Sequence, residues 1–347
     1  MYMNRNYISN TIKGTLALLS VILLSSCNKN LPDHLDALDN DVTYTTTTYE
    51  PVLGRTTLFN NNVNVGKNST LPLDFKIYSI RTADGDPAPE LTSKFPVKVW
   101  KKAYTGAETT LAEIESKREV QYRPLLEIQE KSGEITMWNP GRSSFVKNSP
   151  DPGYVFDVEI SNTGGRKFAR NLKLKPYKER PYEPSTIDPA TGLSLRPYVF
   201  PSLMVNTVGE RTGQFLGFGD MVVYFFKNEE QAGNSLTFSF VDSLNNYINP
   251  DKFNATNWEK LIHGFDMVKT NQKVTYKVAY PIPLINQRTD YTNIDGTRAS
   301  VTFAYRRLGF GGGSVLARLG LDFAIFEEGN WEIQFRFTGE SPRFTNE

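Results

Sequence analysis

The side chains that most often carry catalysis or bind metals are scarce in this chain. It has one cysteine, Cys27, and two histidines, His34 and His263. A zinc site needs several Cys or His ligands, and neither a His-Glu-x-x-His nor a Gly-x-Ser-x-Gly motif is present. Neither histidine belongs to a motif with a serine or cysteine nucleophile. We therefore expect no metal, no cofactor and no enzyme activity.

Residues of three other kinds of site occur in the sequence: a dinucleotide loop, a calcium site and the carboxylates of a glycosidase. Gly309–Ser314 is glycine-rich, but its spacing is not that of a dinucleotide loop, because Ser314 stands where the last glycine belongs. Asp84, Asp86 and Glu90 offer oxygen ligands for calcium, although Asp-Gly is first a turn signal. Two carboxylates from distant segments would suffice for glycoside hydrolysis, so a glycosidase stays a less favoured alternative.

Cys27 is placed for lipidation. Arg5 and Lys13 precede an apolar run from Leu16 to Leu24, and Ser25-Ser26-Cys27 follows. This is the pattern of a signal peptide, and the run is too short for a membrane span of roughly 20 residues. The small-small-Cys ending resembles the lipobox of bacterial lipoproteins. We expect residues 1–26 to be removed and Cys27 to carry the lipid anchor.

Charge and composition narrow the class of protein further. The formal net charge is +1, and removal of residues 1–26 leaves 37 basic against 38 acidic residues. This balance gives no electrostatic footprint for nucleic acid. The chain has 22 Phe, 17 Tyr, 25 Gly and 20 Pro, which favours strands joined by many turns. With Cys27 lipidated, no thiol is left for a disulfide or for catalysis.

The composition along the chain predicts an all-β protein with two β-sandwich domains and one short helix in each. After the signal peptide comes a lipidated, flexible tether, residues 27–42. An immunoglobulin-like sandwich follows at 43–176, a proline-rich linker at 177–194 and a second sandwich at 195–347. Proline removes backbone donors, so its density in the linker favours stiff extended chain.

Period-two alternation predicts the strands of the first domain. Apolar residues alternate over 71–78, 154–160 and 168–174, with Asn162–Gly165 as the turn between the last two. Residues 126–128 and 135–137 predict two further strands around a turn at 131–133. Thr110 to Glu113 is a capping box that opens a short helix.

Three predictions concern the second domain. Residues 221–226 are apolar on both faces and predict a central strand, with 236–240 returning beside it as a hairpin. A second capping box at 256–259 predicts a helix, whose apolar face would hold Trp258, Leu261, Ile262 and Phe265. Alternation over 319–325 and again over 331–337 predicts a hairpin around Glu327–Asn330.

Tryptophans are the candidate ligand contacts, because flat apolar rings stack on sugar rings. Trp258 and Trp331 fall on core-facing patterns. Trp100 shares the face of Lys98, and Trp138 abuts the turn Asn139–Gly141. We predict that Trp100 and Trp138 are exposed and stack on glycan. The alternative is that each ring packs under a loop.

Two segments carry a family resemblance. Pro51–Thr57 and Leu321–Glu332 resemble a Bacteroidetes outer-membrane lipoprotein family that has no established activity. The predicted architecture is similar to that of the glycan-binding lipoproteins of starch-utilisation-type loci. This resemblance implies a lipid-anchored, non-catalytic protein of the outer membrane, on the cell-surface or periplasmic face. It would capture polysaccharide for an outer-membrane transporter complex. A structural or adhesive role in a cell-surface complex is the alternative.

Overall fold

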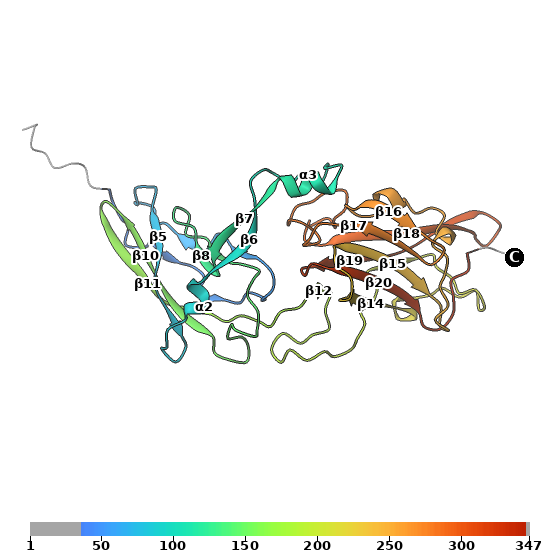
Figure 1. Cartoon of the computed structure of the whole chain (residues 1–347), viewed down its shortest axis with the longest axis horizontal. Coiled ribbons are helices and arrows are strands. Elements are labelled where there is room, and N and C mark those ends of the chain that lie inside the picture. The colour runs from blue at the N-terminus through green and yellow to red at the C-terminus, as the bar shows by residue number, and fades with distance from the viewer. Residues whose placement is uncertain (1–35, 345–347) are drawn as a thin grey trace, which may run out of the picture.

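The computed structural model describes residues 36–344 and has two β-rich halves lying end to end (Figure 1). The predicted all-β sandwich class is confirmed. Cys27 and His34 lie outside the described residues. The predicted tether is described only from Asp36, and this part lies against the first half. The backbone amides of Ala37 and Asp39 donate to the hydroxyls of Thr70 and Ser69.

The first half is a sandwich whose core lies between a four-stranded and a three-stranded sheet. The larger sheet has the order β2-β11-β10-β5 and the smaller one the order β3-β9-β8. Large buried rings such as Tyr49, Tyr154 and Phe156 fill the core. The elements are β1 (Thr43–Tyr44), β2 (Thr48–Tyr49), β3 (Thr57–Phe59), β4 (Val63–Asn64), β5 (Asp74–Thr82), α2 (Pro89–Thr92), β6 (Lys94–Trp100), α3 (Leu111–Ser116), β7 (Arg118–Pro124), β8 (Leu126–Ile128), β9 (Ile135–Met137), β10 (Tyr154–Asn162) and β11 (Gly165–Leu174).

The second half packs a five-stranded sheet of order β14-β20-β15-β17-β16 against a sheet built on β19. Strands β12, β13 and β18 all pair with β19. Phenylalanines from both sheets meet in one core. The elements are β12 (Tyr182–Glu183), β13 (Leu203–Val205), β14 (Met221–Asn228), β15 (Ser235–Val241), β16 (Phe265–Lys269), β17 (Lys273–Lys277), β18 (Ala299–Leu308), β19 (Ser314–Ile325) and β20 (Asn330–Phe337), with 3-10 turns at Phe218–Asp220, Pro250–Lys252 and Trp258–Lys260.

Local predictions from the first half are confirmed. Strands β8 and β9 pair as a hairpin, and β10 and β11 pair around the turn at 162–165. Half of the capping box forms: the Thr110 hydroxyl accepts from the Glu113 amide, and α3 begins after Thr110, at Leu111. The Glu113 carboxylate accepts from the Thr109 amide instead of the Thr110 amide.

The long-range predictions in the second half are wrong. The predicted hairpin of 319–325 with 331–337 does not exist, because β19 and β20 belong to opposite sheets of the sandwich. Strand β14 is an edge strand rather than a central one. It does not pair with β15, since β20 lies between them and runs parallel to β15.

The predicted helix after residue 256 is also absent. Only Trp258–Lys260 forms a 3-10 turn, and Phe265 already begins β16. Trp258, Leu261 and Ile262 are nevertheless buried, as their apolar character demands. Both α-helices among residues 36–344 therefore lie in the first half, in α2 and α3.

Candidate functional site

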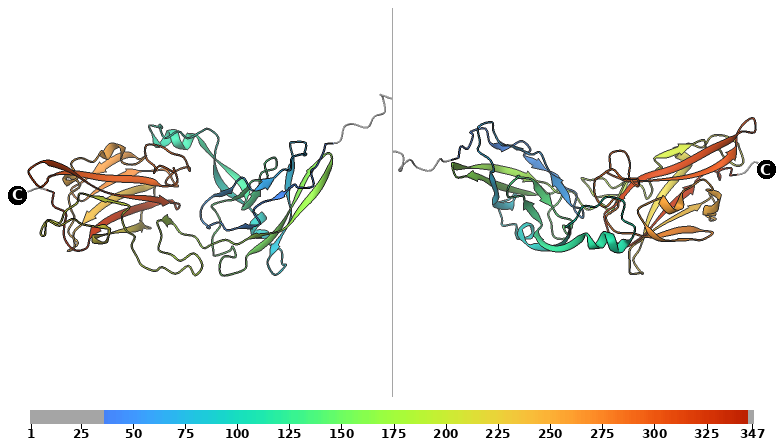
Figure 2. Two further views of the ribbon diagram at one scale, coloured as in Figure 1. Left: turned by 180° about the vertical axis from the view of Figure 1, so that it is seen from behind. Right: turned by 90° about the horizontal axis from the view of Figure 1, so that it is seen from above.

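An arm of the first half reaches across to the second. Strands β6 and β7 form a two-stranded ribbon, and residues 101–117 with α3 extend from its end to the second half (Figures 1 and 2). Arg118 begins β7 at the base of this arm and is buried. Its guanidinium donates to the Tyr280 carbonyl at 2.7 Å and lies over the Trp100 ring. The arm is therefore fastened to the second half at its base.

A buried carboxylate holds the arm loop in shape. Glu108 accepts hydrogen bonds from the amides of Thr105 and Gly106, both at 2.9 Å, and pairs with Lys117 at 2.5 Å. Burial alone would raise the pKa of Glu108, but the hydrogen bonds from Lys117 and Thr105 outweigh it and lower the pKa to about 2. The loop thus keeps an ionised carboxylate at neutral pH.

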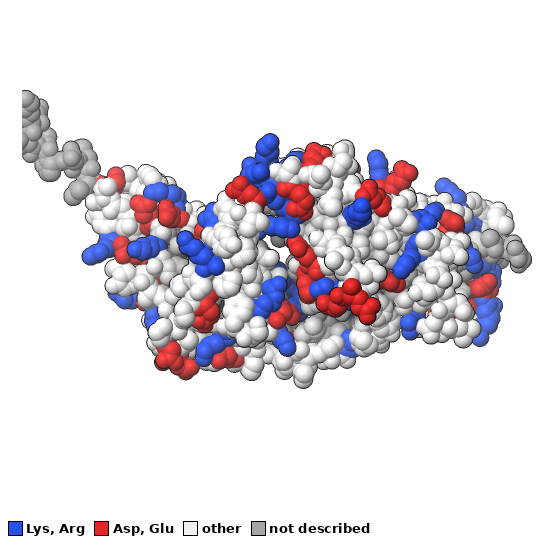
Figure 3. Space-filling model, viewed as in Figure 1, with Lys and Arg blue, Asp and Glu red and all other residues white. Residues whose placement is uncertain are grey.

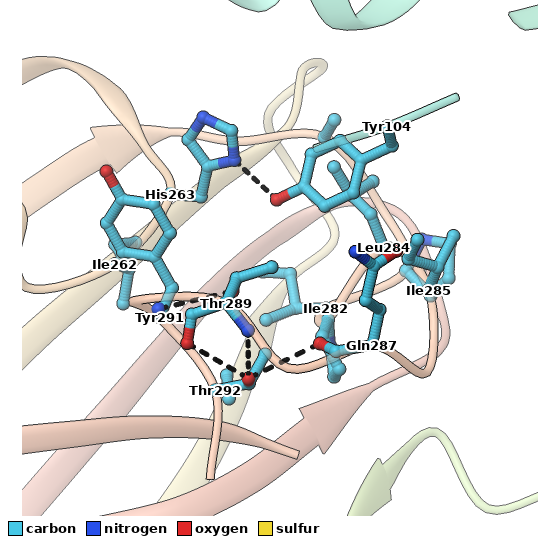
Figure 4. Close-up of a pocket in the computed structure, with 14 residues that line it drawn as sticks. Tyr104, Ile262, His263, Ile282, Leu284, Ile285, Gln287, Thr289, Tyr291 and Thr292 are labelled. Atoms are coloured by element: carbon cyan, nitrogen blue, oxygen red, sulfur yellow. Dashed lines mark hydrogen bonds between the residues drawn. The ribbon is translucent and has the colours of Figure 1, made fainter. Parts of the chain in front are cut away.

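His263 joins the arm to the second half (Figure 4). Its Nε2 lies 2.8 Å from the Glu108 carbonyl, which can only accept, so Nε2 carries the proton. Burial raises the pKa of Tyr104, so its hydroxyl keeps its proton and donates to Nδ1 at 2.5 Å. The imidazole also stacks on Tyr291, with ring centroids 4.8 Å apart and planes at 6°. Both nitrogens are thus used in structural contacts.

The hollow beside His263 is small. About 30 Å³ of it is open to the centres of water-sized molecules, which is room for about two waters. On its polar side, the Thr292 hydroxyl accepts from the Thr289 amide and donates to the Gln287 carbonyl. Apolar residues, among them Ile262, Ile282 and Leu284, make up much of the rest of its lining. This hollow is a small gap in the packing between the arm and the second half, and it is too small for a ligand such as a sugar.

A second hollow is larger and more open. About 270 Å³ of it is open to water-sized molecules, and its lining is polar. It is formed by the loop after β14 and the turn before β20. The side chains that line it are those of Lys227, Asn228, Glu229, Gln231, Asn234 and Glu328, together with small residues.

The β6–β7 ribbon turns one face toward this open hollow. Lys98 bonds to Glu328, a lining residue, at 2.8 Å. Lys98 pairs with Val120 and Pro96 pairs with Tyr122, so these four side chains share a face of the ribbon. Val120 is 60% exposed and Tyr122 is 67% exposed. We call this face and the open hollow together the junction site.

The two predicted tryptophans are both half-buried. Trp100 does lie on the face of Lys98, but it packs against Tyr104 and under Arg118. Trp138 donates its ring N–H to Glu127 at 2.7 Å and packs against the core of the first half. Stacking of either ring on glycan stays a prediction. The predicted ligand contacts do not include Tyr122, although Val120 and Tyr122 alternate with polar residues, as in a strand.

Residues 36–344 show neither a metal-binding cluster nor a membrane-spanning helix. Within that range, no group of three or more His, Cys, Asp and Glu residues is arranged to hold a metal ion. Asp84–Asp86 forms a turn, with the Thr82 amide donating to the Asp86 carbonyl. None of the described helices is long and apolar enough to cross a membrane.

Comparisons with known proteins give one family and one weak structural likeness. No curated protein matches the chain. One similar solved structure is a SusE-like surface-located polysaccharide-binding protein from the heparin utilisation locus of Bacteroides thetaiotaomicron. The identity is 11% and the TM-score 0.22. The match covers 85% of this chain and only 53% of the other, and a likeness at this level carries no argument. A family model described as a domain of unknown function, DUF5007, matches residues 64–346 and so spans both halves and the arm. The chain belongs to the DUF5007 family.

Proposed function

We propose that this chain is a lipid-anchored, non-catalytic protein that binds polysaccharide at the junction site for an outer-membrane uptake system. One observation carries the proposal: the exposed Tyr122 and Val120 lie beside an open hollow lined by amide and carboxylate side chains. The family match spans both halves that build this site.

The chemistry of the junction site suits a sugar chain. A pyranose ring has an apolar face that packs on an aromatic ring, and its hydroxyls need donors and acceptors at the rim. The side-chain amides of Asn228, Gln231 and Asn234 supply both hydrogen-bond donors and acceptors. Strand residues rise about 3.4 Å each, so Tyr122 lies about 7 Å beyond Val120 along the ribbon. The site would therefore hold an oligosaccharide segment rather than a single sugar.

Hydrolysis of the bound glycan is not proposed. Glu327 and Glu328 are ion-paired with Lys227 and Lys98, and both are partly exposed to water. A glycosidase acid needs an apolar pocket that keeps it protonated, which is the opposite environment. The site has the features of a surface that holds its ligand without cleaving it.

The binding site is tested with Tyr122→Ala. We expect the mature protein to be retarded in affinity gels that contain its glycan, and Tyr122→Ala to weaken binding at least tenfold. The matched control is Tyr78→Ala, since Tyr78 is a similarly exposed tyrosine on β5, which belongs to the larger sheet of the first half. Trp100→Ala should also weaken binding, because Trp100 shares the face of Tyr122. If Tyr122→Ala and Tyr78→Ala were retarded equally, the junction site would not be the glycan-binding site.

The anchor is tested with Cys27→Ala. Stable attachment takes about two lipid chains or signals, which a lipoprotein cysteine supplies at one residue. We expect Cys27→Ala to move the protein from the membrane fraction to the soluble fraction. Tyr122→Ala, which keeps Cys27, should stay with the membranes. If Cys27→Ala also stays there, the proposed anchor is wrong.

A further inference from the structure

We propose that the junction site selects neutral or amine-bearing glycans and discriminates against sulfated and uronic acid polysaccharides. This inference rests on the proposed function and adds the ligand class. It starts from the charges around the open hollow. Four glutamates, at positions 229, 230, 327 and 328, are close to or within its lining, against the two lysines Lys98 and Lys227. Figure 3 shows acidic side chains gathered at the middle of the molecule, where the halves meet.

The two lysines at the hollow are already engaged. Lys98 pairs with Glu328 at 2.8 Å. Lys227 is bonded to Glu327 and lies 3.5 Å from Glu229. A sulfate or carboxylate that entered the hollow would have to displace one of these carboxylates to reach a cation. It would otherwise meet only the neutral amide donors of Asn228, Gln231 and Asn234, beside an excess of carboxylates that repels it.

The neighbouring arginines do not supply a cation to the site. Arg118 is buried and turned to the Tyr280 carbonyl and to Glu115. Arg123 pairs across the ribbon with Phe95, on the face opposite Lys98 and Tyr122, and is bonded to Glu127. Four glutamates, at positions 229, 230, 327 and 328, against Lys98 and Lys227 thus leave an excess of two negative charges among these six side chains.

Hydroxyls and ammonium groups meet no such barrier. The amides of the lining exchange hydrogen bonds with hydroxyls, and a carboxylate such as Glu229 accepts from an ammonium group. The side chain of Glu229 is 77% exposed, so a ligand can reach it. Exposed charges are screened beyond about 10 Å at 0.1 M salt, so the discrimination must be strongest at low salt.

The test uses the mature, lipid-anchored protein in detergent micelles and measures glycan binding by calorimetry. The probes are neutral oligosaccharides of glucose, mannose and xylose, chitosan oligomers, heparin and polygalacturonate. We expect at least one neutral or amine-bearing glycan to bind at least fivefold more tightly than heparin and polygalacturonate at low salt. The ratio should shrink in 1 M salt.

The charge is tested with the double variant Glu229→Gln and Glu230→Gln. We expect it to reduce the discrimination against the acidic glycans at least threefold. The control is Asp84→Asn with Asp86→Asn, which removes two exposed acids from a turn of the first half. If heparin or polygalacturonate bound as tightly as any neutral glycan, and if Tyr122→Ala abolished that binding, this inference would be wrong. The proposed function would still hold. Failure to bind any of the probes would overturn both.

Discussion

At the scale of single residues, Glu108 makes the arm a defined structure rather than a loose loop. Its carboxylate is buried, holds two backbone amides and pairs with Lys117. We expect Glu108→Gln to lower the free energy of unfolding by about 2–3 kcal/mol at pH 7, because each pKa unit corresponds to about 1.4 kcal/mol. The control is Glu119→Gln, an exposed glutamate of β7, with an expected change within about 0.5 kcal/mol.

The same carboxylate gives a pH dependence with a definite sign. Its pKa falls from 4.5 to about 2 on folding. Its contribution is therefore complete above pH 4.5 and is lost as the pH falls toward about 2. Denaturation at several pH values should show the wild type and Glu108→Gln converging over this window. A constant difference between them from pH 7 to pH 2 would contradict the assignment.

At the scale of elements, the sequence predicts strands well and their partners poorly. The alternation in 154–160 and 168–174 gives a correct pair, because the turn at 162–165 brings the second strand back beside the first. The alternation in 319–325 and 331–337 is just as regular, yet these strands lie in opposite sheets. Period-two alternation indicates which side of a strand is buried. It does not indicate which of the two sheets the strand joins, because strands of both sheets bury one side in the same core. The partner is decided by long-range contacts.

The missing helix has a similar cause. Helical spacing is present in Trp258, Leu261, Ile262 and Phe265. The 3-10 turn at Trp258–Lys260 is instead held by contacts with a distant strand. The hydroxyl of Tyr276 on β17 donates to the Trp258 carbonyl, and a side chain at Gly264 would meet the Tyr276 side chain. A tightly packed strand thus overrides local spacing. The same limit applies to the site: the sequence places Trp100 on the face of Lys98, while the arginine above its ring, Arg118, bonds to Tyr280 from a distant segment.

At the scale of the whole molecule, the two halves are fastened at two separate points. One is the β6–β7 ribbon with its arm, where Arg118 bonds to the Tyr280 carbonyl, His263 bonds to Tyr104 and Glu108, and Lys98 pairs with Glu328. The other is Arg55 of the first half, which pairs with Glu183 at 2.6 Å and lies 3.8 Å above the Phe326 ring. Arg298 of the second half also approaches Glu183, at 3.5 Å. The junction site lies between parts of both halves, so its shape depends on these fastenings.

Two fastenings predict redundancy, since either one alone restricts the relative motion of the halves. We expect Arg55→Ala and Arg118→Ala to leave the radius of gyration near that of the wild type when made singly, and to increase it by a small amount when combined, because the bonds of His263 and Lys98 remain. Small-angle X-ray scattering measures this directly. The control pair is Arg81→Ala with Arg343→Ala, because each of these arginines bonds within its own half. The double variant should also lose glycan affinity, since Tyr122 and the open hollow would no longer be held at a fixed separation. An unchanged radius together with unchanged affinity would mean that neither arginine sets the geometry of the junction site.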